Sequence, residues 1–132
     1  MDSTVEKKKL IILVLGDIVT LGVVTLYGFA SHGELGTAGW RMLTTFAPLL
    51  LAWLLVAPFL GAYDLQRAAD WRQLWRPAWA MVLGGPLAAW LRAWMLGNVP
   101  ILPVFVGVLS GVGALAILFW RALYTFVVAR KL

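Results

Sequence analysis

One stretch of sequence decides the fold of this chain: LIILVLGDIVTLGVVTLYGFA, residues 10–30. An α-helix rises ~1.5 Å per residue, so about 20 apolar residues cross a hydrocarbon layer ~30 Å thick. Three further stretches of similar length and character follow, at about residues 42–62, 78–97 and 104–129. The pattern predicts an all-α fold, a polytopic membrane protein whose single domain over residues 1–132 is a four-transmembrane-helix bundle.

The composition supports this class. The chain is 62% hydrophobic and 13% charged, whereas a soluble domain averages ~45–50% and ~25%. The net charge of +5 comes from Lys and Arg at the ends of the apolar stretches, where anionic lipid headgroups would meet them. We therefore expect the lipid bilayer as a partner and no nucleic acid. The sequence has no cysteine, which excludes disulfides, thiol catalysis and iron–sulfur clusters.

The basic residues also predict the orientation. Four spans place both tails and the middle loop on one side, and the opposite side has Arg41 as its one basic residue. Cytoplasmic loops carry an excess of Lys and Arg, so both termini are predicted to be cytoplasmic in a multi-pass protein of the cell (plasma) membrane. A cleaved signal peptide is the alternative for residues 10–30, but its apolar core is typically only ~7–15 residues long. The basic residues on the predicted cytoplasmic side are Lys7, Lys8, Lys9, Arg67, Arg72, Arg76, Arg130 and Lys131.

The middle loop contains a periodic aromatic pattern. Trp71, Trp75 and Trp79 recur every four residues, which places them on one face of a helix. This spacing predicts a short cytoplasmic interfacial helix between the second and third spans, with its aromatic side toward the membrane. The alternative is an aromatic belt at the start of the third span, which would account for Trp75 and Trp79.

Three ionised residues interrupt the apolar stretches: Asp17, Arg92 and Arg121. A charge at membrane depth costs at least ~2.5–3.5 kcal/mol, so it is usually paired or faces the bundle interior. Counting ~1.5 Å per residue from the cytoplasmic edge places Asp17 and Arg121 about 10–12 Å deep. We therefore predict that they contact each other. The pair is either a structural link between two helices or part of a functional binding site, and both readings stay open here.

The same depth count places further candidates. It assigns Trp53 and the segment Gly84, Gly85 and Pro86 to the layer of the predicted ion pair. That segment predicts a break in the third span, which is either a packing kink or a binding site of the kind found in transporters. A pair of small residues, Gly107 and Gly111, predicts close helix packing, either within the bundle or at a dimer seam.

Arg92 lies about 21 Å from the cytoplasmic edge by the same count. Its layer holds hydroxyl groups and no carboxylate, so its expected partner is Glu34 in the outer loop or the hydroxyl layer itself. His32 precedes Glu34 by two residues and is the second outer-loop candidate. One His and one Glu do not make a metal site without further ligands, so no metal and no cofactor are predicted.

The sequence contains no motif for catalysis: no Ser/His/Asp set, phosphate loop or paired carboxylates, so no catalytic residue is predicted. Three functions remain. The first is transport of a small solute or proton through a polar intramembrane site. The second is a non-catalytic accessory or structural subunit, in a homo-oligomer or a larger membrane complex. The third is a membrane enzyme acting on lipid or quinone. A polar cavity that reaches Asp17 would favour the first over the second.

The order and spacing of several short motifs resemble an uncharacterised family of small integral membrane proteins, catalogued as domain of unknown function 3054. The resemblance covers nearly the whole chain and implies a four-span membrane fold without implying an activity. The residues that carry it are Gly16-Asp17, Ser31-His32-Gly33, Pro48, Trp53, Ala57-Pro58, Gly61-Ala62-Tyr63, Pro86, Leu91-Arg92, Phe105 and Trp120-Arg121.

Overall fold

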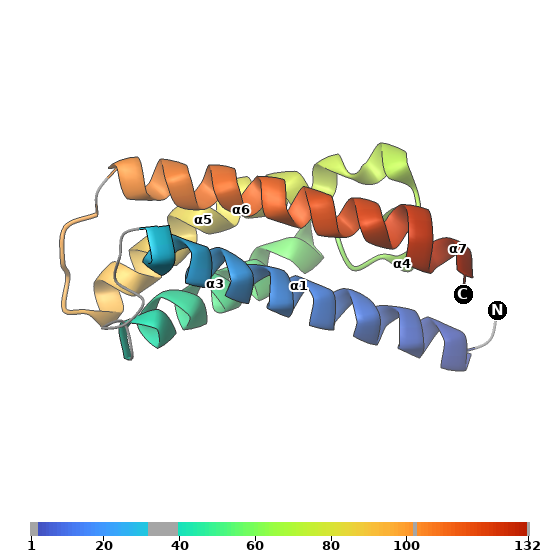
Figure 1. The fold of residues 1–132 in the computed structure, drawn as a ribbon, viewed down its shortest axis with the longest axis horizontal. Helices are drawn as coiled ribbons and strands as arrows, with labels where there is room; N and C mark the ends of the chain where they lie inside the picture. The colour runs from blue at the N-terminus through green and yellow to red at the C-terminus, as the bar shows by residue number, and fades with distance from the viewer. Residues whose placement is uncertain (1–2, 32–39, 102, 132) are drawn as a thin grey trace.

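The computed structural model describes residues 3–31, 40–101 and 103–131, and within these ranges it contains helices and turns but no β-strand. Four helices are long: α1 (Ser3–Ser31), α3 (Trp40–Phe59), α5 (Trp75–Met95) and α6 (Pro103–Leu123). A π-helical segment, η2 (Tyr124–Val128), continues α6 into α7 (Ala129–Lys131). Between α3 and α5 lie α4 (Leu65–Ala68) and the 3₁₀ turn η1 (Trp71–Gln73). The start of α1, the end of α7 and α4 all lie at one end of the elongated bundle (Figure 1).

The helices are those of a membrane protein in length and composition. Three described segments are long and apolar enough to cross a membrane: Ser3–Gly28, Arg41–Phe59 and Pro103–Lys131. Helix α5 has 21 residues but is not among them, because four tryptophans and two arginines lower its hydropathy. The all-helical, apolar architecture is thus confirmed, and the fourth span stays a prediction.

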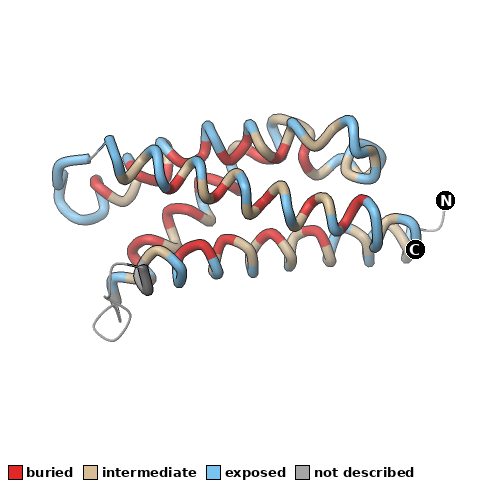
Figure 2. Tube along the Cα trace, turned by 45° about the horizontal axis from the view of Figure 1, so that its top comes forward, coloured by how far each residue is buried: buried red, intermediate tan, exposed pale blue. Residues whose placement is uncertain are grey.

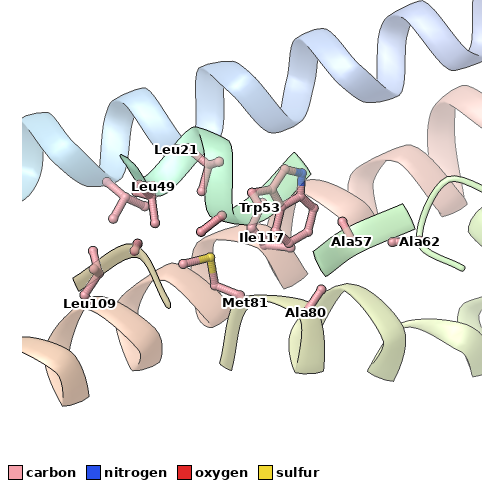
Figure 3. Packing of buried hydrophobic residues seen from close by; sticks show 12 residues of the cluster. Leu21, Leu49, Trp53, Ala57, Ala62, Ala80, Met81, Leu109 and Ile117 are labelled. Carbon is pink, nitrogen blue, oxygen red and sulfur yellow. The ribbon is translucent and has the colours of Figure 1, made fainter. Parts of the chain in front are cut away.

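Helix α5 packs against α3 and α6, and α1 packs against α6 and α3. The buried side of each long helix faces the others, and the exposed side faces outward (Figure 2). All four contribute to the apolar core (Figure 3): Leu21 from α1, Leu49 and Trp53 from α3, Met81 from α5 and Ile117 from α6. In a bilayer the surrounding lipid would be as apolar as these side chains, so such a bundle would depend on close packing rather than on exclusion from water.

Small residues set that packing, but not the pair predicted from the sequence. A Cβ added at Gly107 or Gly111 would meet nothing within 4 Å, so their prediction as a packing surface inside the bundle is wrong. The buried face of α6 instead carries Leu109, Gly113, Ile117 and Arg121. The close approach occurs at Gly85, where a Cβ would lie 3.0 Å from the Cα of Ser110.

Helix α5 runs without interruption through Gly84, Gly85 and Pro86. Both glycines are buried against neighbouring helices, whereas Pro86 is exposed. On α6, Gly85 lies opposite Ser110, which precedes Arg121 by 11 residues or about 16 Å. Placing this segment in the layer of Arg121 was therefore wrong. The depth count assumed that the start of the third span and the end of the fourth lie at the same level. In the structure the end of α6 and η2 extend alongside the loop between α3 and α5, where Arg121 and Thr125 bond to its carbonyl oxygens.

That loop does not form the single interfacial helix predicted from its tryptophans. Asp64 accepts hydrogen bonds from the backbone of α4, and Asp70 accepts one from the backbone N–H of Arg72, so two separate caps divide the segment. The backbone hydrogen bond from Arg72 also lowers the pKa of Asp70. Trp75 and Trp79 belong to the first turns of α5, as the alternative of an aromatic belt expects.

Candidate functional site

The predicted contact between Asp17 and Arg121 is present and buried. Arg121 donates from Nε to Oδ1 of Asp17 at 3.0 Å and from Nη2 to Oδ2 at 2.8 Å. The two side chains are 0% and 2% exposed. A bidentate arginine–carboxylate pair is among the strongest polar contacts in proteins, and it joins α1 to α6 here.

Two aromatic residues complete this site. The hydroxyl of Tyr63 donates to Oδ2 of Asp17 at 2.5 Å and accepts from Nε1 of Trp53 at 2.8 Å. Nη1 of Arg121 donates to the carbonyl oxygen of Ala62 at 2.7 Å. The Arg121 guanidinium also lies 5.2 Å from the centre of the Tyr63 ring. We call Asp17, Trp53, Tyr63 and Arg121, with the Ala62 carbonyl, the polar network.

The turn after α3 places Tyr63 in the network. Gly61 has φ +78°, a backbone conformation that side chains disfavour, and the N–H of Ala62 bonds back to the carbonyl of Ala57 at 3.0 Å. The turn therefore presents both the Ala62 carbonyl and the Tyr63 hydroxyl to the bundle. The depth count missed Tyr63 because this residue lies beyond the apolar stretch of the second span. The sequence does indicate a turn at Gly61, with a polar aromatic side chain directly after it.

Gly16 allows α1 to reach the network. A Cβ at this position would lie 1.9 Å from the Trp120 ring, so α1 presents bare backbone to that ring. Asp17 and Arg121 follow Gly16 and Trp120 directly in sequence. The contact between Gly16 and Trp120 therefore brings the carboxylate and the guanidinium within bonding distance.

The chemistry of the network is that of a balanced ion pair. The Asp17 carboxylate accepts three hydrogen bonds, and Arg121 donates three. A guanidinium has five N–H donors, so two are left for other partners. The described residues contain no group of three or more His, Cys, Asp or Glu that could hold a metal.

A pocket lies directly beside the network, with an empty volume of about 230 Å³ including its open mouth. Arg121 is part of its lining and Asp17 is not. This space therefore borders Arg121 and leaves Asp17 outside it. We call it the arginine pocket, and its lining consists of Gly61, Ala62, Arg67, Ala68, Gln73, Leu74, Arg76, Pro77 and Arg121.

Arg92 belongs to a different place in the bundle. Its Nε donates to the hydroxyl of Thr45 at 3.2 Å, and its guanidinium lies 5.3 Å from the centre of the Phe105 ring. The hydroxyl layer is one of the three partners expected for Arg92, beside Glu34 and His32, and no described hydrogen bond joins Arg92 to Asp17. The other candidates, His32 and Glu34, lie outside the described residues. Whether any of these residues binds a ligand stays a prediction.

Tyr63 provides a test of the network. Burial and the neighbouring Asp17 carboxylate raise the pKa of its phenol above the ordinary value. The folded protein thus keeps a proton that the unfolded chain releases above about pH 10. The protonated phenol therefore contributes to stability below that pH, and this contribution is lost as the pH rises further.

We expect Tyr63→Phe to cost about 1.5–3 kcal/mol at neutral pH, because Asp17 loses a donor. Thermal melts between about pH 8 and 11 should show a smaller alkaline loss in Tyr63→Phe than in the wild type; equal losses would contradict this role.

The comparisons with known proteins concern the same residues. A family model described as "Protein of unknown function (DUF3054)" matches residues 14–124, a range that includes all four side chains of the polar network. No curated protein matches the chain, and no solved structure matches it. Since the matched range covers most of the sequence and agrees with the resemblance of its short motifs, the chain belongs to the DUF3054 family.

Proposed function

We propose that this protein is a non-catalytic integral membrane protein, and that it acts by binding other membrane components at its surface. The observation that carries the proposal is the closure of the polar network. A carboxylate that binds a transported solute must be reachable, but Asp17 is 0% exposed and its oxygens already accept three hydrogen bonds. The network therefore holds α1, α6 and the turn after α3 together.

The bundle interior supports the same reading. Beyond the network, Leu21, Leu49, Met81 and Ile117 are each 0% exposed and pack together from four helices (Figure 3). Because these side chains fill the interior between the helices, a solute could pass only if the helices separated. Arg92 donates to Thr45, which precedes Trp53 on α3 by eight residues or about 12 Å, and no described hydrogen bond joins Arg92 to Asp17.

In this proposal the protein crosses the cell membrane four times, with both termini in the cytoplasm. The packing of α5 between α3 and α6 supports its role as the fourth span. The basic tails and the arginines of the middle loop gather at one end of the bundle, which supports the orientation (Figure 1).

Transport is the second candidate, and specific observations favour it. Three buried polar atoms on α6 and η2 lack a hydrogen-bond partner among the described residues: Ser110 Oγ, Trp120 Nε1 and Tyr124 Oη. Unpaired buried groups are costly, and they are found where water or a ligand enters in another state. In that reading the pair of Asp17 and Arg121 is a closed gate, and the arginine pocket is its approach from the cytoplasm.

Proton flux into liposomes separates the two candidates. The purified protein is reconstituted with a pH-sensitive dye inside, and an imposed potassium diffusion potential drives protons inward. We expect the flux to equal that of protein-free liposomes, for the wild type and Asp17→Asn alike. A wild-type flux that Asp17→Asn abolishes and Asp64→Asn preserves would overturn the proposal in favour of the gate. Asp64 is a matched control because its carboxylate is exposed on the middle loop.

A further inference from the structure

Two of the arginines that line the arginine pocket, Arg67 and Arg76, are not part of the polar network. Three of its lining residues are arginines, and none is acidic. Asp17 faces Arg121 from within the bundle, and Asp64 lies 3.8 Å from Nε of Arg67. Asp64 is itself half exposed, so it neutralises Arg67 only weakly. The inside of the pocket is therefore positively charged.

The arginines also hold unused donors. Arg76 donates from Nε to the Gln73 side chain at 2.7 Å and from Nη1 to the Leu60 carbonyl at 2.9 Å. These two contacts fix its guanidinium, and its Nη2 has no hydrogen bond among the described residues. Neither Nη atom of Arg67 has one either, and Nη1 lies close to Gly61, where an added Cβ would approach it to 2.6 Å. The glycine thus leaves room for a guanidinium at the pocket wall.

Guanidinium groups with unused N–H donors favour phosphate groups as ligands. Arginine forks match the geometry of phosphate oxygens and bind them with two parallel hydrogen bonds. Exposed tryptophans are typical of the headgroup level of a membrane, and two lie in the same segment of the chain: Trp71 is 61% exposed, and Trp75, 47% exposed, lies under the Arg76 guanidinium at 4.4 Å. A phosphate at this level would reach the pocket from the lipid surface or from the cytoplasm.

We propose that the arginine pocket binds a phosphate group, carried either by an anionic lipid headgroup or by a free phosphate compound. Arg67 and Arg76 hold the phosphate oxygens, and Arg121 lines the pocket beside them while it remains paired with Asp17. This site is independent of whether the network conducts protons, so the liposome flux and the binding described next can succeed or fail separately.

The test uses the whole protein in a neutral detergent, with dihexanoyl phosphatidic acid, dihexanoyl phosphatidylcholine and inorganic phosphate as probes. Binding is followed as the rise in thermal midpoint with probe concentration. Arg67→Gln is the test variant, because Arg67 is half exposed and its loss leaves the backbone contacts of Arg76 in place. Arg72→Gln is the matched control: it removes the same charge from the same loop, at a side chain that is 72% exposed and outside the pocket lining.

We expect phosphatidic acid to bind, and Arg67→Gln to weaken its binding about tenfold, the size of one lost charge-assisted hydrogen bond, while Arg72→Gln leaves it unchanged. Binding of phosphatidic acid alone identifies a lipid headgroup site. Comparable binding of inorganic phosphate identifies a site for free phosphate compounds. The proposal is overturned if neither probe binds, if phosphatidylcholine acts as well as phosphatidic acid, or if both variants weaken binding equally.

Discussion

Replacing Asp17 by alanine is expected to lower the free energy of unfolding by about 3–5 kcal/mol, because it leaves the Arg121 charge buried without its counterion. Arg121 is 2% exposed, and of its three hydrogen bonds only the one to the Ala62 carbonyl would remain. Tyr63 would lose its acceptor in the same change. Removing one partner of a buried pair costs far more than the pair itself contributes, since the remaining charge is desolvated and uncompensated.

The double variant Asp17→Ala with Arg121→Leu should regain much of that loss, because neither charge is then buried alone. Thermal unfolding in detergent, followed for the wild type, both single variants and the double variant, measures the coupling between the two residues. Asp64→Asn serves as the control, since it removes the charge of a half-exposed carboxylate that pairs only loosely with Arg67 and keeps an oxygen that can cap α4. Unchanged stability in Asp17→Ala would show that the ion pair does not hold the bundle together.

The ion pair could be predicted from the sequence because two strong constraints agreed. A charge inside an apolar stretch needs a partner, and Asp17 and Arg121 lie at similar distances from the predicted cytoplasmic ends of their apolar stretches. The same arithmetic failed for Gly84–Pro86, because it needs the relative heights of two helices, which tertiary packing decides. The level of Arg121 falls before the start of α5, near Gln73 and Leu74, which line the pocket beside it.

Tyr63 and the arginine pocket lay beyond the reach of that reasoning for a different reason. Both depend on how the loop between α3 and α5 folds back along α6, as the 2.8 Å hydrogen bond from Thr125 to the Ala68 carbonyl shows. Hydrophobic periodicity says where a span ends, but the path of an irregular segment is set by individual turns and caps. In this chain those are the positive φ of Gly61 and the caps at Asp64 and Asp70.

The sequence also leaves open which face of each helix turns toward the bundle, and substitutions of glycines on different faces test this. The spacing of Gly107 and Gly111 matches a packing motif, yet both face away from the bundle. Helix α6 instead turns Gly113 toward Met81 and Ser110 toward Gly85. A motif of small residues shows that backbones can approach closely, but several faces of a glycine-rich helix satisfy it equally well.

Gly85→Leu is therefore expected to destabilise the bundle by about 3 kcal/mol or more, at the upper end of the range for overpacked cores. The new Cβ would lie 2.9 Å from the Cβ and 3.0 Å from the Cα of Ser110, so rotating the Ser110 hydroxyl away cannot relieve the contact and α5 and α6 must separate. Gly111→Leu is the matched control on the facing helix, and it should change the thermal midpoint little, since no atom lies within 4 Å of its added Cβ. A loss of stability in Gly111→Leu accompanied by a smaller particle on size exclusion would place a second copy of the chain on that face. Equal stability of Gly85→Leu and wild type would mean that α5 and α6 do not meet at Gly85.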